Sequence, residues 1–238
     1  MENKENNSSQ KTPDKKQSRR GVRVITWKMR AWYSVCKFFV QIIMLLVFRL
    51  RTYGVKHTEI RGGALIVSNH QSYLDPLAIG ARIRGKINYL ARKGLFRFKP
   101  FAQLIESFDA IPLDQEGIGY EGIKETFKRL KNGERVLIFP EGARTLDENG
   151  EIMPFKRGVM SLAVRAKSAI IPAAIAGAFE TWPRYQKFPH LFPDRKNAIR
   201  VIFSEPIPYE QAAAMPEDEL HEYVEKRVRE LYEQIRRF

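Results

Sequence analysis

The sequence predicts an α/β fold: a single domain with a mixed sheet flanked by helices, preceded by an amphipathic, apolar N-terminal helix. Short apolar runs bounded by glycine, proline and polar residues alternate with apolar stripes at helical spacing, as in chains that alternate strands with helices. At 238 residues the chain is long enough for one such domain with extensions. It contains no internal repeat, P-loop or dinucleotide-binding fingerprint.

The N-terminal quarter differs from the rest of the chain in composition. Residues 1–20 are almost all polar or charged, which predicts a disordered basic tail. We expect residues 21–56 to form a membrane-associating helical segment and residues 57–238 to form the α/β domain. Residues 1–60 hold 13 Lys and Arg against 4 Asp and Glu, so +9 of the net charge of +14 lies there. This asymmetry indicates an anionic partner, either a membrane or a nucleic acid.

A helix is expected over residues 27–48. Its uninterrupted apolar part, residues 38–48 with one Gln, would rise roughly 16 Å as a helix, against about 30 Å of bilayer hydrocarbon. Aromatic and basic residues surround this part, which favours a helix lying in the membrane interface over one that spans it. A buried core helix is the alternative. Arg49 and Arg51 follow where a signal peptide would need a small-residue cleavage site.

The remainder reads as alternating strands and helices. Apolar runs predict six strands, over residues 64–68, 87–91, 108–113, 135–139, 170–176 and 199–203. The Asp-Pro pair predicts a helix opening at Asp75, and further helices are expected over residues 120–131, 157–166 and 218–235. Residues 179–192, rich in proline and aromatic residues, predict a loop that either covers the surface or lines an acyl channel.

One imidazole and one carboxylate follow the first of these apolar strands. His70 should leave the strand end, while Asp75, as a helix N-cap with Pro76 at the first helical position, should lie across a tight loop from it. An ionised Asp75 that accepts a hydrogen bond from one ring nitrogen leaves the other nitrogen free as a base. The alternative is a simple cap beside a polar strand-end residue.

A second polar pair follows the strand expected over residues 135–139. Arg144 can fork onto a phosphate, while Glu141 can accept from a hydroxyl or hold that arginine. A structural ion pair between Glu141 and Arg144 is the alternative.

Together the two stretches resemble the glycerolipid acyltransferase family, and within it the bacterial 1-acyl-glycerol-3-phosphate (lysophosphatidate) acyltransferases. The family motif N-H-x-x-x-x-D appears here as Asn69, His70 and Asp75. The later motif F-P-E-G-x-R-S/T appears as Phe139, Pro140, Glu141, Gly142, Arg144 and Thr145. Residues 154–158 and 170–174 resemble the family's P-F-K-x-G and I-I-P-hydrophobic segments, so the order of motifs agrees over about residues 62–208.

One segment departs from the family pattern. Gln115 follows Asp114 where the family usually carries an arginine that helps bind the acceptor's phosphate, and glutamine has no charge to offer. Arg92 and Lys93 fall in a stretch that resembles the family's basic A-K-x-E-L segment. With Lys156 of the P-F-K-R-G segment, they are candidates for contacting the reaction's oxyanion or the phosphate.

The resemblance implies an enzyme of phospholipid biosynthesis. It would transfer a fatty acyl group from acyl-CoA or acyl-carrier protein to the 2-hydroxyl of 1-acyl-glycerol-3-phosphate, giving phosphatidate. His70 would be the general base, Asp75 its orienting partner, and Glu141, Gly142, Arg144 and Thr145 would bind the acceptor and its phosphate. No cofactor, metal or nucleic acid is implied. The partners would be the lysophospholipid, the acyl donor and an anionic membrane surface on the cytoplasmic side.

Other acceptors and two other functional classes stay open at this point. Gln115 leaves glycerol-3-phosphate or another lysolipid as the acceptor. The net charge of +14 is also typical of a nucleic-acid-binding protein, although that leaves the ordered motifs unexplained. His70, Asp75 and Glu141 are also residue types found in metal-dependent phosphoesterases. The chain has no H-E-x-x-H spacing, and its single cysteine, Cys36, excludes a cysteine cluster and intramolecular disulfides.

Overall fold

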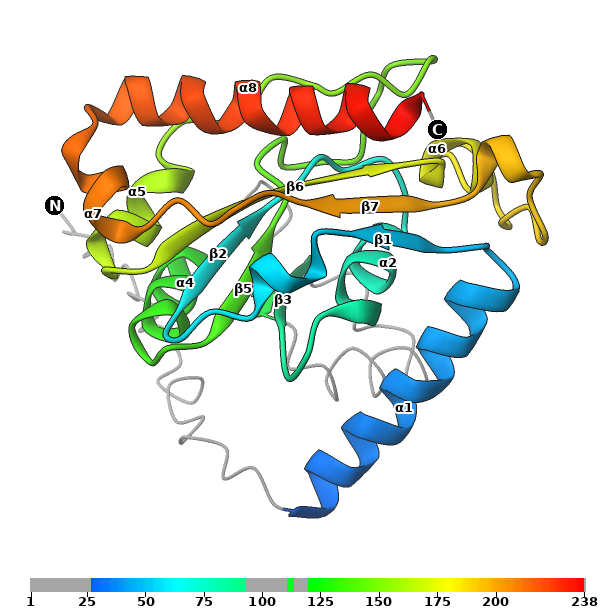
Figure 1. The fold of residues 1–238 in the computed structure, drawn as a ribbon, viewed down its shortest axis with the longest axis horizontal. Helices are drawn as coiled ribbons and strands as arrows, with labels where there is room; N and C mark the ends of the chain where they lie inside the picture. The colour runs from blue at the N-terminus through cyan, green and yellow to red at the C-terminus, as the bar shows by residue number, and fades with distance from the viewer. Residues whose placement is uncertain (1–26, 93–110, 114–119, 238) are drawn as a thin grey trace, which may run out of the picture.

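The computed structural model describes residues 27–92, 111–113 and 120–237. The predicted tail, residues 1–20, lies outside these ranges, as do Lys93, Asp114 and Gln115. Figure 1 shows a twisted sheet with helices on both faces and a long helix, α1, reaching away from the body. The predicted α/β class with a mixed, helix-flanked sheet is confirmed.

Seven strands form the sheet, in the order β1-β7-β6-β2-β5-β3-β4. All neighbours pair in parallel except β6 and β7, which are antiparallel. The strands are β1 (Arg51–Tyr53), β2 (Ala64–Val67), β3 (Asn88–Arg92), β4 (Ile111–Leu113), β5 (Arg135–Ile138), β6 (Ala169–Ala176) and β7 (Arg200–Phe203). Because β2 lies between β5 and β6, the carboxyl ends of these parallel strands meet at one edge of the sheet.

Helices cover the two faces of the sheet. The described helices are α1 (Trp27–Leu46), α2 (Asp75–Arg82), α4 (Tyr120–Lys131), α5 (Val159–Arg165), α6 (Ala178–Thr181), α7 (Tyr209–Ala214) and α8 (Glu217–Arg236), with short 3₁₀ turns η2 (Val55–Thr58) and η4 (Arg195–Asn197). Strand β2 shows the division: Leu65 and Val67 pack with α5 and α8, whereas Ala64 and Ile66 pack with α2 and the end of α1. This alternation is the two-residue period of a strand buried on both faces.

Some elements of the structure differ from those predicted, and others agree with them. Strand β1 was not predicted, because three residues with no apolar run carry too little pattern; it forms by pairing with β7, far along the chain. The predicted loop over residues 179–192 opens with the short helix α6. The stripe predicted over residues 218–235 is confirmed as packing, since Leu220, Val224, Val228, Leu231 and Ile235 of α8 are all buried.

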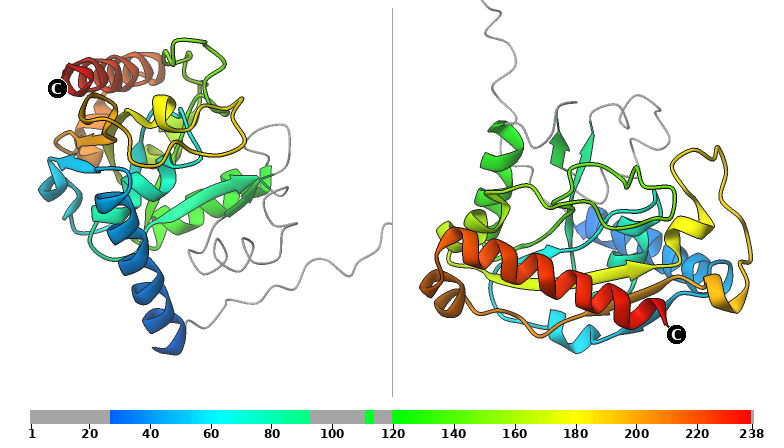
Figure 2. Two further views of the ribbon diagram at one scale, coloured as in Figure 1. Left: turned by 90° about the vertical axis from the view of Figure 1, so that its right-hand side faces the viewer. Right: turned by 90° about the horizontal axis from the view of Figure 1, so that it is seen from above.

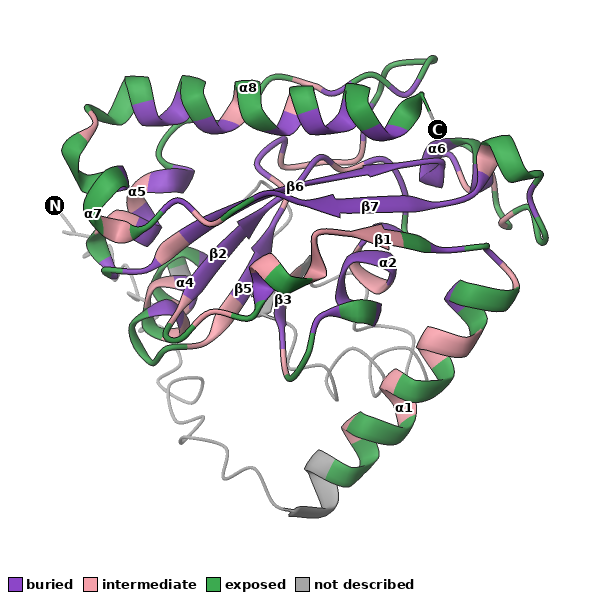
Figure 3. Cartoon of the chain, in the orientation of Figure 1, coloured by how far each residue is buried: buried purple, intermediate pink, exposed green. Residues whose placement is uncertain are grey.

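Helix α1 has two unlike sides. On one side Met44 is buried, and the side chains of Lys37 and Gln41 donate hydrogen bonds to backbone carbonyls at the C-terminal end of α2. On the other side seven large apolar side chains are exposed: Trp32, Val35, Phe38, Phe39, Ile43, Leu45 and Leu46. The exposed surface of α1 is plain in Figure 3. Among the described helices, none has the length and hydropathy that a membrane crossing requires.

Candidate active site

The loop that follows β2 is tied at its first residue to the neighbouring strand. Asn69 is fully buried, and its side-chain amide makes two hydrogen bonds with the backbone of Ile175 in β6. The amide nitrogen donates to the Ile175 carbonyl, and the amide oxygen accepts from the Ile175 N–H, both at 2.9 Å. Both bonds fix the direction in which the chain enters His70.

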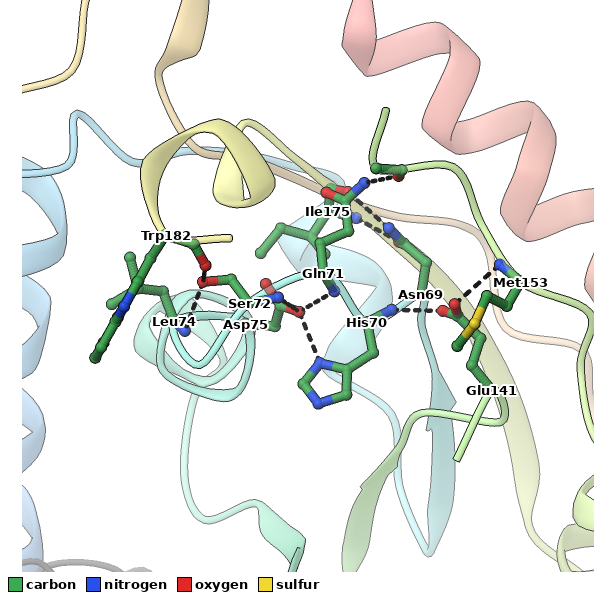
Figure 4. Close-up of polar contacts among 11 residues, drawn as sticks. Asn69, His70, Gln71, Ser72, Leu74, Asp75, Glu141, Met153, Ile175 and Trp182 are labelled. Atoms are coloured by element: carbon green, nitrogen blue, oxygen red, sulfur yellow. Dashed lines mark hydrogen bonds and ion pairs between the residues drawn. The ribbon is translucent and has the colours of Figure 1, made fainter. Parts of the chain in front are cut away.

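The structure brings His70 and Asp75 together. Oδ2 of Asp75 accepts a hydrogen bond from Nδ1 of His70 at 2.8 Å and from the backbone N–H groups of Gln71 and Ser72 at 2.6 and 2.8 Å. Because an ionised carboxylate only accepts, Nδ1 carries the proton and Nε2 is left as the basic nitrogen. Figure 4 shows Nε2 pointing away from Asp75.

The predicted cap is displaced by one residue. Asp75 is the first residue of α2, Leu74 is the N-cap, and no side-chain cap is formed there. The carboxylate instead folds back to accept N–H groups of the loop before the helix. The single side chain thereby orders the loop and the imidazole together, and it is completely buried.

The imidazole of His70 is held on a second side by an aromatic ring. It stacks on Phe139 with ring centroids 4.1 Å apart and an angle of 15° between the planes. Phe139 follows β5, so the ring that supports His70 comes from the strand next to β2. The His70 side chain is 19% exposed, which leaves room for a reacting group at Nε2.

Glu141 is buried beneath the same site. Its two carboxylate oxygens accept hydrogen bonds from the backbone N–H groups of His70, at 2.6 Å, and Met153, at 3.0 Å. Burial raises the pKa of Glu141 to about 8, and the two N–H bonds counter part of that effect. Glu141 therefore joins the backbone of its own turn to the backbone at His70 and at Met153.

Arg144 lies against an aromatic ring. Its guanidinium carbon is 3.5 Å from the ring centre of Tyr73, in the geometry of a cation–π contact. The ring of Tyr73 in turn lies 5.2 Å from that of Trp182. The next residue, Thr145, donates its backbone N–H to the carbonyl of His70 at 2.8 Å. The turn that carries Arg144 is thus attached directly to the loop of residues 69–75, which carries His70.

The sequence and fold of this chain match known proteins. The family model described as Acyltransferase matches residues 49–176, more than half of the chain. The 1-acyl-sn-glycerol-3-phosphate acyltransferase of Bacillus subtilis (strain 168) is 30% identical over 204 residues, which cover 84% of this chain and 96% of that protein. The chain belongs to the acyltransferase family.

Two further comparisons place this acyltransferase more broadly. The human 1-acyl-sn-glycerol-3-phosphate acyltransferase alpha is 30% identical over 149 residues, which cover 58% of this chain and about half, 52%, of that protein. The crystal structure of the 1-acyl-sn-glycerophosphate acyltransferase from Thermotoga maritima aligns with a TM-score of 0.72, covering 87% of this chain and 80% of that one. At 21% identity that likeness concerns the fold. The resemblance to the bacterial glycerolipid acyltransferases is therefore confirmed.

The remaining predicted site residues of the acyltransferase are Gly142, Thr145 and Lys156, at or against the turn after β5, and the pair Arg92 and Lys93. Gly142 has a φ of 75°, and the side chain of Lys156 packs so closely over it that an added Cβ would lie 2.7 Å from Nζ. The Thr145 hydroxyl donates to the Glu151 carbonyl at 2.7 Å. Arg92 is the last residue of β3, and Lys93 lies outside the described residues.

Several residues that support the site were not predicted from the sequence. Gln71 is buried and donates its amide to the Gly150 carbonyl at 2.6 Å and to the Tyr232 hydroxyl of α8 at 2.9 Å. Tyr73 lies inside the first motif, at a position where the motif allows any residue. Met153 reaches Glu141 through its backbone N–H, which no side-chain pattern reveals. Within the described ranges, no group of three or more His, Cys, Asp or Glu is placed to hold a metal ion.

Proposed function

We propose that this acyltransferase transfers a fatty acyl group from acyl-CoA or acyl-carrier protein to the 2-hydroxyl of 1-acyl-glycerol-3-phosphate, giving phosphatidate. The observation that carries the chemistry is the bond from His70 Nδ1 to Asp75, which leaves Nε2 as a partly exposed base. The choice of acceptor is supported by the activity named for the relative that aligns over 96% of its own length.

The reaction needs two proton transfers, one from the acceptor hydroxyl and one to the departing thiolate. Nε2 of His70 takes the proton of the acceptor hydroxyl as its oxygen attacks the thioester carbonyl carbon. Asp75 stabilises the imidazolium that forms. The tetrahedral intermediate collapses with cleavage of the carbon–sulfur bond, and the imidazolium returns its proton to the departing thiolate. Donor and acceptor are both bound, so no covalent acyl-enzyme is required.

The acceptor's phosphate is assigned to the turn after β5. Arg144 is the forked cation of this turn, and the bond from the Thr145 N–H to the His70 carbonyl keeps the turn beside the base. Gly142 gives the turn its positive φ, and Lys156 over it adds a second positive charge. Glu141 supports this turn by accepting hydrogen bonds from the N–H groups of His70 and Met153. Arg92 and Lys93 are assigned to contacts with the oxyanion or the phosphate.

We also propose that the enzyme acts at the cytoplasmic face of a membrane, held by the segment 21–56. The exposed side of α1 carries Phe38, Phe39 and Leu46, more than half exposed each, which is apolar area that lipid can cover. Salt screens the attraction of basic residues to anionic lipid, but it does not weaken apolar burial. We therefore expect high salt to release little of the protein from membranes and detergent to release all of it. Complete release by salt alone would contradict the interfacial assignment.

The decisive experiment measures thiol release from acyl-CoA against a panel of acceptors: 1-acyl-glycerol-3-phosphate, glycerol-3-phosphate and a lysolipid without a free phosphate. We expect rapid release with the first, little with the others, and none with the His70→Ala variant. Preference for glycerol-3-phosphate would reassign the acceptor. Loss of activity with a chelator, with no thiol released by any acceptor, would favour a phosphoesterase. Salt-dependent binding to duplex DNA in place of anionic vesicles would favour a nucleic-acid-binding protein.

A further inference from the structure

A second exposed apolar surface lies on the loop between α6 and β7. Four large side chains within eight residues are mostly exposed: Tyr185 (74%), Phe188 (72%), Leu191 (60%) and Phe192 (64%). We call residues 185–192 the aromatic loop. The prolines on either side, Pro183 and Pro193, are buried, so the ends of the loop are anchored while its apolar side chains face outward. Large apolar side chains gathered and exposed in this way mark a surface that something else covers.

Internal hydrogen bonds shape the aromatic loop in this outward form. Nε1 of Trp182 donates to the Gln186 carbonyl at 3.2 Å, and the His190 N–H donates to the Thr181 carbonyl at 2.8 Å. Phe192 adopts a φ of 57°, a left-handed conformation that is costly for a bulky residue. The backbone of the aromatic loop is thus fixed in a conformation that leaves its aromatic side chains exposed.

The charge around the aromatic loop fits a lipid surface. Residues 183–197 contain four basic residues, Arg184, Lys187, Arg195 and Lys196, against one acidic residue, Asp194. All four basic residues are exposed. Aromatic and aliphatic side chains flanked by cations are the composition of segments that sit at the headgroup level of anionic bilayers.

The chain that leaves the aromatic loop runs beside the chain that leaves α1. The chain leaving the loop meets the chain leaving α1 at Ile199, whose N–H donates to the Phe48 carbonyl at 3.3 Å and whose carbonyl accepts from the Arg51 N–H at 2.9 Å. Leu46, at the end of α1, is 70% exposed. Figure 1 shows the C-terminal end of α1 and the segment between α6 and β7 at the right-hand side of the molecule, and the left view of Figure 2 looks onto that side.

Trp182, just before the aromatic loop, touches the loop of residues 69–75, which carries His70 and which we call the catalytic loop after the proposed function. The Ser72 hydroxyl donates to the Trp182 carbonyl at 2.9 Å, and the rings of Tyr73 and Trp182 are 5.2 Å apart. We propose that the aromatic loop inserts into the interface of an anionic bilayer as a second contact besides α1, and that it holds the entrance to His70 against the lipid. An acceptor in the bilayer then reaches Nε2 without passing through water. This last step rests on the proposed function.

The first test removes the apolar side chains. The triple variant Phe188→Ser, Leu191→Ser, Phe192→Ser is compared with the control Ile123→Ser, Tyr223→Ser, which removes exposed apolar side chains from α4 and α8. Flotation uses phosphatidylcholine vesicles with and without 30% phosphatidylglycerol. We expect the triple variant to lose about tenfold or more in vesicle binding, since burial of apolar side chains in the bilayer interface favours the bound state. The control should bind as wild type does.

Activity separates this proposal from the proposed function. The triple variant should lose activity on bilayer lysophosphatidate and stay within about twofold of wild type on a short-chain soluble acceptor. Equal loss on both acceptors would make the loop part of the site itself, and unchanged flotation would overturn the membrane contact. If wild type released no thiol with any acceptor, the proposed function would fail while flotation still tested the loop.

A fluorescence experiment keeps the proposal testable if the triple variant misfolds. In a Cys36→Ser background, an environment-sensitive dye is attached at Phe188→Cys and, as a control, at Tyr223→Cys. Emission at position 188 should shift to the blue when anionic vesicles are added, while emission at position 223 stays constant. A bound protein with no shift at position 188 would show that the loop stays in water and is covered by something else, such as a protein.

Discussion

The catalytic loop and the aromatic loop are joined through Ser72 and Trp182, which lies just before the aromatic loop, yet they are built in opposite ways. Asn69, Gln71 and Asp75 are buried, and each forms hydrogen bonds that fix the chain around His70. The aromatic loop exposes its largest apolar side chains and carries cations around them. The first loop takes its order from inside the protein, because a base must be held within fractions of an ångström of its productive position. The second keeps its apolar area for burial against a partner.

The largest loss of activity is expected when the proposed base of the catalytic loop is removed. His70→Ala should lower turnover by roughly 10² to 10⁴-fold, since a positioned base contributes about that much. Stability should change little, because the side chain is partly exposed and its main partner is Asp75. Asp75→Asn should also be severe, since the amide can donate to the imidazole and favour the wrong tautomer.

The measurement is steady-state thiol release with urea unfolding of the same preparations. Asp75→Asn should also lose stability, because Oδ2 serves two backbone N–H groups besides the imidazole. A His70→Ala enzyme within threefold of wild type would end the proposed mechanism.

Beneath the base, Glu141 should make the stability of this loop depend on pH. Its pKa in the folded protein, about 8, lies above the ordinary value of 4.5. A raised pKa means that the contribution of the neutral carboxyl is fully present below pH 4.5 and is lost as the pH rises through 8. The loss approaches about 1.4 kcal/mol per pH unit within that window.

The variant Glu141→Gln cannot ionise, so it isolates this contribution. The unfolding free energy of wild type minus that of Glu141→Gln should decrease from pH 5 to pH 8, as measured by urea titration at each pH. Glu222→Gln, at an exposed glutamate of α8, serves as the control and should show a constant difference. A constant difference for Glu141→Gln as well would mean that the N–H groups of His70 and Met153 keep the carboxylate ionised throughout.

The sequence anticipated the catalytic loop better than its supports. One apolar run followed by an Asp-Pro helix start was enough to predict that His70 and Asp75 meet across a tight loop. The same patterns say nothing about Gln71 reaching α8, 161 residues away, or about a backbone N–H of Met153 reaching Glu141. Such contacts depend on the packing of distant elements, and only the folded chain specifies them.

The fold shows the same difference between features set by local sequence and features set by distant contacts. Strands with long apolar runs, such as β6, were predicted nearly to the residue, whereas β1 exists only because β7 lies beside it. The position of Asp75 was off by one because its carboxylate serves the loop and not the helix end. Local propensity predicts a cap there, and tertiary hydrogen bonding decides otherwise.

A smaller effect is expected at the turn beside the catalytic loop. Arg144→Ala should raise the KM for lysophosphatidate by about 10- to 100-fold, because a hydrogen bond to a charged group contributes about 1.5–3 kcal/mol. The KM for acyl-CoA should stay within about twofold. Arg144→Lys should recover part of the loss, since a lysine keeps the charge and loses the fork. Weakened use of the donor alone would show that this turn binds acyl-CoA.

The smallest effect tests whether the boundary between the two loops serves the site. Tyr73 lies between the guanidinium of Arg144 and the ring of Trp182, so it aligns the arginine by contact with its face. A cation–π contact at a partly exposed ring contributes about 0.5–1 kcal/mol, which corresponds to a change of a few fold in affinity. Tyr73→Leu should therefore raise the acceptor KM by a few fold with little change in kcat, while Tyr73→Phe, which keeps the ring, should behave as wild type does. A double variant with Arg144→Ala should show no further loss, because the ring acts through the arginine. If Tyr73→Phe were as impaired as Tyr73→Leu, the hydroxyl would be the functional group, and the ring would only fill space between the catalytic loop and the aromatic loop.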